Sequence, residues 1–309
     1  YTVFIFFKLL DERVKDWYFI ANPLPILSFT VTYLITVKII GPKIMRNRKA
    51  FELRKAMIAY NTTMVITSLV MFIEMANLIE WGKYAFTCQK VDTSTADVPM
   101  RMCNIGWYFL VTKFIEYIDT IFFVLRKKEN QVTTLHIIHH ASVPISVWFG
   151  FKFAPGGNNA LFPVMNSFVH VIMYLYYGLS AFGPKVQKYL WWKRYITSMQ
   201  LIQFVILLIH GVHKYVNDCD FPKVFLWLNI GNAVIFFALF FDFYRTSYVK
   251  IDKKVKIDEM PATTSDAKCA PNKLKAVDVY SILYKTIAKN SFSKQLWSLT
   301  LFKFKSKLC

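Results

Sequence analysis

The sequence predicts an all-helical membrane protein with seven transmembrane helices. Hydrophobic residues make up 55% of its 309 residues, Phe alone occurs 29 times, and the mean hydropathy is +0.34. Soluble chains are rarely so apolar. A transmembrane helix needs about 20 mostly apolar residues. Seven stretches meet this requirement, at residues 24–41, 57–80, 105–125, 134–151, 161–181, 195–213 and 224–245.

The loops between these stretches give the predicted bundle an orientation. The loops after the first, third and fifth spans together carry 13 Lys and Arg residues, and those after the second, fourth and sixth carry 6. Basic residues accumulate in cytosolic loops. We therefore expect a luminal N-terminus, a transmembrane domain at residues 1–245 and a basic, partly flexible cytosolic tail at residues 246–309.

Two cysteines lie in loops that this orientation places on the non-cytosolic side. Cys88 precedes the third span and Cys219 precedes the seventh. An oxidising compartment favours disulfides, so we predict a bond between Cys88 and Cys219, with two free thiols as the alternative. No cysteine lies in the cytosolic half of the predicted bundle.

The net charge of +19 indicates anionic partners. The basic residues flank spans or lie in the tail and form no nucleic-acid motif, so we expect no nucleic acid. Anionic membrane lipids and a phosphate-bearing substrate fit better. Lys305 and Lys307 near the C-terminus have the spacing of a dilysine signal for retrieval to the endoplasmic reticulum.

Polar side chains inside the predicted spans are costly in a bilayer and are usually functional. The third span contains "KFIEYIDT", and the fourth begins with "HIIHH". The fifth contains "HVIMYLYY", and the sixth begins with "TSMQLIQF". Helical spacing brings the polar members of each motif onto neighbouring positions of one face. They are Lys113, Glu116, Asp119 and Thr120, then His136, His139 and His140, then His170, Tyr174 and Tyr177, and finally Thr197, Gln200 and Gln203.

The predicted orientation places all four motifs in the middle or cytosolic half of the membrane. This common depth indicates one shared site that opens to the cytosol. Each motif also has a structural alternative. The glutamines could form interhelical hydrogen bonds, the tyrosines could belong to an aromatic belt, and Lys113 with Glu116 could be a neutral ion pair. We interpret His210 and His213 as interfacial and leave them out of the site.

Three histidines on one helical face are also compatible with a metal site. Membrane di-iron desaturases and hydroxylases carry HxxHH clusters, but they use about eight or more histidines in several clusters. This chain has 6 histidines, of which four lie near the predicted site. We therefore expect no metal and no bound cofactor.

The four motifs, in this order and spacing, closely resemble the ELO family of very-long-chain fatty-acid elongases. The resemblance extends from "DERVKDW" to "DFYRTSY" and includes "LRKK" and "GPKVQKYLWWKRY". It implies a seven-helix protein of the endoplasmic reticulum whose last six helices surround an acyl-chain tunnel open to the cytosol. It also implies a 3-ketoacyl-CoA synthase that joins a long-chain acyl-CoA to malonyl-CoA, its co-substrate, and releases CoA and CO2.

The resemblance implies partners as well, namely a second copy of the chain and the reductases and dehydratase of the elongation cycle. The alternatives are a di-iron desaturase or hydroxylase and a non-enzymatic seven-helix transporter or receptor. A transporter or receptor explains the spans but gives no reason for HxxHH at a cytosolic entrance.

The residue types of the four motifs suit condensation. Since no cysteine lies at the right depth, a histidine is the candidate nucleophile, and we predict an acyl-enzyme on His139. His136 and His140 would orient it or transfer protons, and His170 would act near the thioester. Glu116 and Asp119 would accept hydrogen bonds from imidazoles, with Lys113 balancing their charge. Tyr174, Tyr177, Gln200 and Gln203 would stabilise the thioester oxygen and the enolate.

Overall fold

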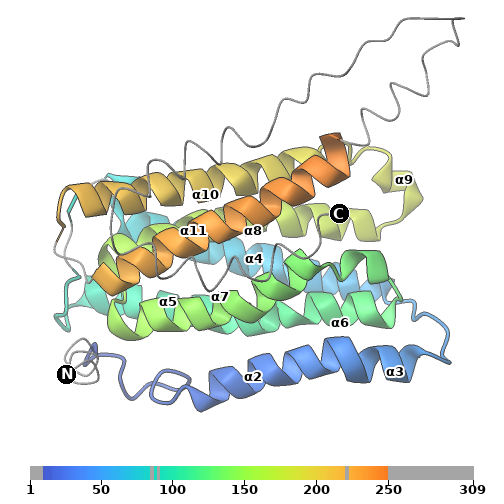
Figure 1. The fold of residues 1–309 in the computed structure, drawn as a ribbon, viewed down its shortest axis with the longest axis horizontal. Helices are drawn as coiled ribbons and strands as arrows, with labels where there is room; N and C mark the ends of the chain where they lie inside the picture. Colours follow the sequence, from blue (N-terminus) through green and yellow to red (C-terminus); the bar gives the residue numbers. More distant parts are fainter. Residues whose placement is uncertain (1–9, 84–86, 89–90, 220–222, 250–309) are drawn as a thin grey trace, which may run out of the picture. The chain divides into compact units, whose positions relative to one another are not determined.

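The computed structural model describes residues 10–83, 87–88, 91–219 and 223–249 (Figure 1). These residues lie in one compact unit, residues 1–258, and a second unit comprises residues 259–309. Cys269, Cys309, Lys305 and Lys307 of the predicted tail lie outside the described residues.

All regular secondary structure in the described part of the chain is helical. The long helices are α2 (Leu24–Ile35), α4 (Arg54–Leu78), α5 (Asp97–Ile115), α6 (Tyr117–Leu125), α7 (Thr134–Phe153), α8 (Leu161–Ala181), α10 (Lys193–Val216) and α11 (Lys223–Tyr244). The short helices are η1 (Thr36–Ile40), α3 (Gly41–Met45), η2 (Glu80–Gly82), η3 (Glu129–Gln131), η4 (Gly157–Ala160), α9 (Pro184–Gln187) and η5 (Arg245–Val249).

Each predicted span coincides with one of these helices or with helices that follow one another directly. Among the described residues, four segments are long and apolar enough to cross a membrane, at Leu24–Met45, Arg54–Leu78, Lys193–Val216 and Lys223–Val249. The chain is therefore a multi-pass membrane protein. The other three predicted spans correspond to α5 with α6, to α7 and to α8, which carry most of the polar motif residues.

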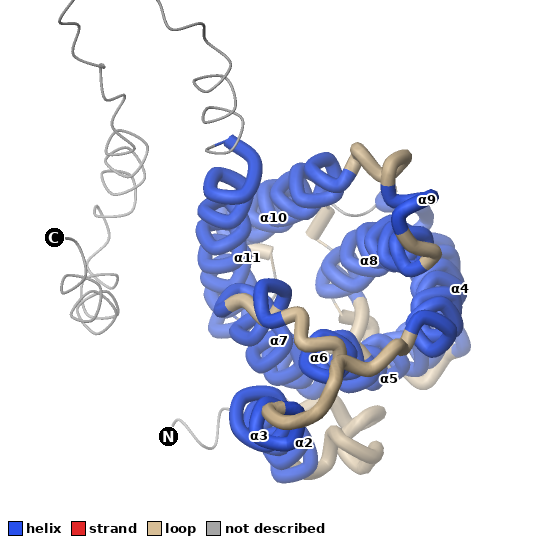
Figure 2. The backbone as a smooth tube through the Cα atoms, turned by 90° about the vertical axis from the view of Figure 1, so that its right-hand side faces the viewer, coloured by secondary structure: helices blue, strands red, loops and turns tan. Residues whose placement is uncertain are grey.

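Six helical segments pack side by side into a closed ring. α4 packs against α8, α8 against α10, α10 against α11, α11 against α7, α7 against α5, and α5 against α4. Figure 2 looks along these helices and shows them around a common centre, with α6 continuing α5. The four polar motifs lie on α5 with α6, on α7, on α8 and on α10, which all belong to this ring.

The first helical segment lies outside the ring, where α2 contacts α7 and α3 contacts α6 (Figure 2). The residues before α2 are held by side chains of the ring that donate to their carbonyl oxygens. Trp107 donates to Tyr18 at 2.9 Å, and Trp148 donates to Phe19 at 2.8 Å. Lys152 Nζ donates to the carbonyl oxygen of Ile20 at 3.0 Å. These bonds fix where α2 begins.

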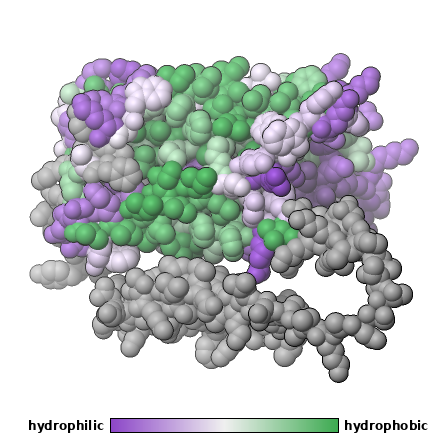
Figure 3. Space-filling model, turned by 90° about the horizontal axis from the view of Figure 1, so that it is seen from above, coloured by the Kyte–Doolittle hydropathy of each residue, from purple (hydrophilic) through white to green (hydrophobic). Residues whose placement is uncertain are grey.

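The surface of the described helices has the pattern of a membrane protein. On the face shown in Figure 3, hydrophobic side chains form a band between two ends that are more polar. Large side chains such as Ile66, Ile202 and Ile235 are more than half exposed. A band of this kind avoids water when the surrounding solvent is lipid.

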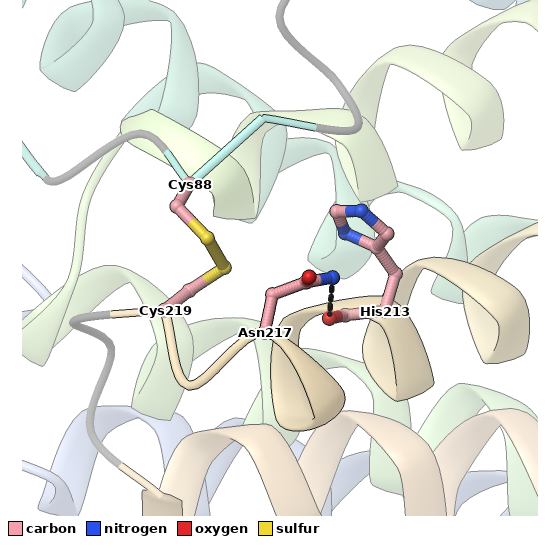
Figure 4. The surroundings of a disulfide bond; sticks show 4 residues. All are labelled: Cys88, His213, Asn217 and Cys219. Carbon is pink, nitrogen blue, oxygen red and sulfur yellow. Dashed lines mark hydrogen bonds between the residues drawn. A yellow bond between two sulfur atoms is a disulfide. The ribbon is translucent and has the colours of Figure 1, made fainter.

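The structure contains a disulfide between the two cysteines that the sequence analysis paired. Cys88 and Cys219 are bonded across 131 residues of sequence, with their Cα atoms 5.0 Å apart (Figure 4). The bond joins the connection between α4 and α5 to the connection between α10 and α11. Nearby, the Asn217 side-chain amide donates to the carbonyl oxygen of His213 at 2.9 Å.

Candidate active site

A buried polar network joins α5 to α8. Glu116 is the single residue between α5 and α6, and it is 2% exposed. Its Oε1 atom lies 2.6 Å from Lys113 Nζ and 3.1 Å from His170 Nδ1. Lys113 Nζ also donates to Asn166 Oδ1 at 2.9 Å. Buried charges need such partners, and the carboxylate fixes the orientation of the His170 ring.

The other carboxylate, Asp119, has a different partner from the one the sequence analysis expected. Tyr174, which is completely buried, donates its hydroxyl to Asp119 Oδ2 at 2.8 Å. Asp119 therefore bonds to a phenol rather than to an imidazole. Because this bond uses the Tyr174 hydroxyl proton, Tyr174 is a weaker candidate than Tyr177 for stabilising a substrate oxygen.

The histidine cluster begins α7. Thr133 caps this helix, and its hydroxyl accepts from the His136 backbone N–H at 3.2 Å. The rings of His136 and His140 lie 4.3 Å apart, and His136 Nε2 lies 2.8 Å from the Thr120 hydroxyl of α6. Thr120 therefore contacts the histidine cluster of α7, whereas Glu116 contacts His170 of α8. The third-span motif thus contacts two neighbouring helices.

His139 faces a different neighbour from the other two histidines of the cluster. Its ring lies 5.2 Å from the ring of Phe236 and 6.0 Å from that of Phe240, both on α11. Its Nδ1 atom is buried and has no hydrogen-bond partner among the described residues. Packing against these two aromatic rings, rather than a hydrogen bond at Nδ1, therefore holds the His139 ring in place.

Two adjoining cavities lie inside the ring. The polar cavity has a volume of about 450 Å³, and the apolar cavity has a volume of about 140 Å³. Four residues line both of them, namely His139, Asn166, Gln203 and Phe204. His136, His140 and His170 line the polar cavity alone. His139 thus stands where the two cavities meet.

Most of the residues that the sequence analysis selected line the polar cavity. They are Glu116, Asp119, His136, His139, His140, His170, Tyr174, Tyr177, Thr197, Gln200 and Gln203. Lys113 and Thr120 do not line it but bond to residues that do. Gln200 contacts the sulfur of Met173 at 3.8 Å. Among the described residues, no group of three or more His, Cys, Asp or Glu side chains is arranged to hold a metal ion.

Sequence reasoning missed several polar residues that line the cavities. Asn166 precedes His170 by four positions on α8, and this spacing inside a span was an available signal. Asn61 of α4 is 2% exposed and lines the polar cavity. His210 was expected at the membrane interface, but it is buried and lines the apolar cavity together with Lys214. His210 therefore faces the interior of the ring, which the sequence analysis did not expect.

Comparison with known proteins places this architecture in a family. Residues 18–256, which include all four motifs, match the ELO family, described as the GNS1/SUR4 family. The chain belongs to this family. It is 46% identical over 243 residues to a very long chain fatty acid elongase of Aedes aegypti, covering 78% of this chain and 68% of that protein.

Two further ELO relatives match this chain at similar identity over a similar length. The chain is 45% identical over 247 residues to very long chain fatty acid elongase 7 of Drosophila melanogaster, covering 80% of this chain and 75% of the fly protein. It is 44% identical over 265 residues to very long chain fatty acid elongase 7 of Rattus norvegicus, covering 85% of this chain and 92% of the rat protein.

Proposed function

We propose that this ELO chain condenses a long-chain acyl-CoA with malonyl-CoA to give a 3-ketoacyl-CoA, CoA and CO2. The observation that carries the proposal is the position of His139, where an apolar cavity suited to an acyl chain meets a polar cavity that contains three other histidines. The names of the ELO relatives support the same activity.

The first half-reaction forms an acyl-enzyme. A neutral ring nitrogen of His139 attacks the thioester carbonyl, the carbon–sulfur bond breaks, and the sulfur leaves with a proton as CoA. The acyl group stays on the imidazole, with its chain in the apolar cavity. Phe236 and Phe240 pack against His139 and limit the access of water to this bond.

The second half-reaction takes place in the polar cavity. Malonyl-CoA loses CO2, and the electron pair that is released forms a bond to the acyl carbon as the bond to His139 breaks. The ring nitrogen that leaves takes up a proton from water, which regenerates neutral His139. Glu116 lies against Nδ1 of His170, so the Nε2 atom of His170 is the one available to the thioester. Tyr177, Gln200 and Gln203 line the same cavity and can donate to the enolate oxygen.

The proposal includes a location and a topology. The seven predicted spans would all cross the membrane of the endoplasmic reticulum, with a luminal N-terminus and a cytosolic C-terminus. The two cavities would form one tunnel that opens to the cytosol, where both CoA esters are found. Malonyl-CoA is a co-substrate, and no bound cofactor enters the scheme. Partners would be membrane lipids, a second copy of the chain, and the reductases and dehydratase of the cycle.

Two basic side chains at the polar cavity are candidates for contacting CoA phosphates. Arg126 and Lys193 both line it. We expect Arg126→Gln and Lys193→Gln each to raise KM for the CoA esters about two- to fivefold, since solvent-exposed ion pairs contribute about 0.2–1 kcal/mol. Steady-state kinetics at low and high salt measure this effect, which should shrink as ionic strength rises.

The matched control for Arg126→Gln and Lys193→Gln is Lys188→Gln. Lys188 is exposed near the same end of α10 but does not line the polar cavity. An equal rise in KM for Lys188→Gln would mean that general surface charge, rather than contact at the entrance, attracts the substrates.

The length of the product should depend on Ala233 of α11. This residue is 5% exposed and lines the apolar cavity. The larger side chain in Ala233→Phe would fill part of the cavity, so we expect products shorter by one or more two-carbon steps. Mass spectrometry of the lipid products measures this shift. Ala238→Phe makes the same change at an exposed position of the same helix, and a similar shift there would contradict the assignment.

The decisive test of the overall proposal uses purified protein with an acyl-CoA and malonyl-CoA labelled in its free carboxyl group. Condensation releases labelled CO2 and a 3-keto product in equal amounts. A transporter or receptor would release none. A desaturase or hydroxylase would need oxygen and a reductant and would leave malonyl-CoA unchanged.

A further inference from the structure

The helix outside the ring is hydrogen-bonded to α6. The hydroxyl of Thr30 on α2 lies 3.1 Å from the hydroxyl of Tyr117, and the hydroxyl of Tyr33 lies 3.0 Å from that of Thr120. The Tyr33 and Tyr117 rings are stacked, with centroids 4.1 Å apart. Both tyrosines are buried. The helix α2 therefore presents two buried hydroxyl groups to the element that carries the third-span motif.

Only one of these two contacts continues into the active site. The Thr120 hydroxyl that meets Tyr33 also lies 2.8 Å from His136 Nε2. The three groups form a chain from Tyr33 through Thr120 to His136. The Thr30–Tyr117 pair lies at the same interface, but no further hydrogen bond connects it to a histidine among the described residues.

The direction of this chain follows from the Tyr33 proton. Among the described residues, the Tyr33 hydroxyl has one hydrogen-bond partner, the Thr120 hydroxyl. A buried hydroxyl proton needs an acceptor, so Tyr33 donates to Thr120. Thr120 then donates its own proton to His136 Nε2. In this arrangement His136 carries its proton on Nδ1, and its Nε2 atom is an acceptor.

We propose that Tyr33 is a positioning residue that fixes the tautomer and orientation of His136 through Thr120; the consequence for catalysis rests on the proposed condensing function. His136 packs against His140 at 4.3 Å, and His140 lies edge-on to His139 with ring centroids 5.4 Å apart. An unfixed His136 would therefore loosen the support of the nucleophile without touching the acyl chain.

The test compares Tyr33→Phe with Tyr117→Phe. Each change removes one buried hydroxyl from the interface between α2 and α6. Loss of one hydrogen bond that acts on the reacting groups should lower the rate of acyl-enzyme formation about three- to tenfold in Tyr33→Phe, with KM for acyl-CoA unchanged. Tyr117→Phe should keep the wild-type rate. Thr120→Ser, which retains the hydroxyl, should stay closer to the wild type than Thr120→Val.

A second measurement reports on the tautomer directly. Nitrogen NMR of histidine-labelled protein in lipid, assigned with His136→Gln, should show one His136 tautomer in the wild type, with the proton on Nδ1. Tyr33→Phe should give a mixture of tautomers, whereas Tyr117→Phe should not. A merely structural role for Tyr33 would leave this signal unchanged.

Two outcomes would overturn the inference. One is an equal loss of rate in Tyr33→Phe and Tyr117→Phe, because both would then act only by docking α2. The other is a wild-type His136 with its proton on Nε2. Since the NMR result needs no turnover, a wild type that forms no 3-keto product and releases no CO2 would contradict the proposed function while leaving the tautomer relay intact.

Discussion

Replacement of His139 by alanine is expected to abolish the acyl-enzyme and to lower condensation at least about a thousandfold. His139 lies where the two cavities meet. This position would bring a ring nitrogen to the thioester while the acyl chain enters the apolar cavity. Intact-protein mass spectrometry after incubation with an acyl-CoA alone measures the adduct. Later addition of malonyl-CoA should discharge the adduct and release CO2.

His213→Ala is the matched control for this experiment, since His213 lines neither cavity. His136→Ala and His140→Ala should slow the formation of the adduct but retain it. An adduct that survives in His139→Ala and disappears in His170→Ala would assign the nucleophile to α8 instead. Product formation by a wild type that never carries an adduct would indicate direct condensation in a ternary complex.

The sequence alone was enough to locate the helices and to bring most of the site together. Runs of apolar residues matched the described helices because a lipid-facing helix needs an apolar surface along its length. The four polar motifs came together because buried polar side chains in a membrane protein face the bundle interior.

The different roles of the three histidines could not be predicted from their spacing. Positions i, i+3 and i+4 share one helical face, so the pattern treats His136, His139 and His140 alike. The rotation of α7 between α6 and α11 separates them, and this rotation depends on packing that is distant in sequence. Tyr33 was missed for a similar reason, since it lies 87 residues from Thr120 and no local pattern connects them.

The polarity of the far end of the apolar cavity was also missed. His210 and Lys214 lie near the end of a span, where basic side chains commonly reach the membrane interface. In the structure both are buried, with 5% and 3% exposure, and both line the cavity. Because residues near a span end can face either lipid or the interior, hydropathy alone does not distinguish the two.

Replacement of Glu116 by glutamine is expected to destabilise the fold by about 3–5 kcal/mol, because it leaves the buried Lys113 ammonium without its counter-charge. Lys113 and Glu116 have side chains that are 3% and 2% exposed, and they lie 2.6 Å apart. Thermal unfolding in detergent measures the loss. Glu74→Gln is the control: its partner Arg101 is half exposed, and exposed pairs contribute about 0–1 kcal/mol.

The double variant Lys113→Met with Glu116→Gln separates the two roles of Glu116. Removing both charges should restore most of the stability, because replacing a buried pair by neutral groups is often neutral or favourable. Condensation should remain about a hundredfold below the wild type, since His170 still lacks the carboxylate that orients it. If activity returned together with stability, Glu116 would serve only to neutralise Lys113. If Glu116→Gln were no less stable than Glu74→Gln, the result would contradict a buried ion pair between Lys113 and Glu116.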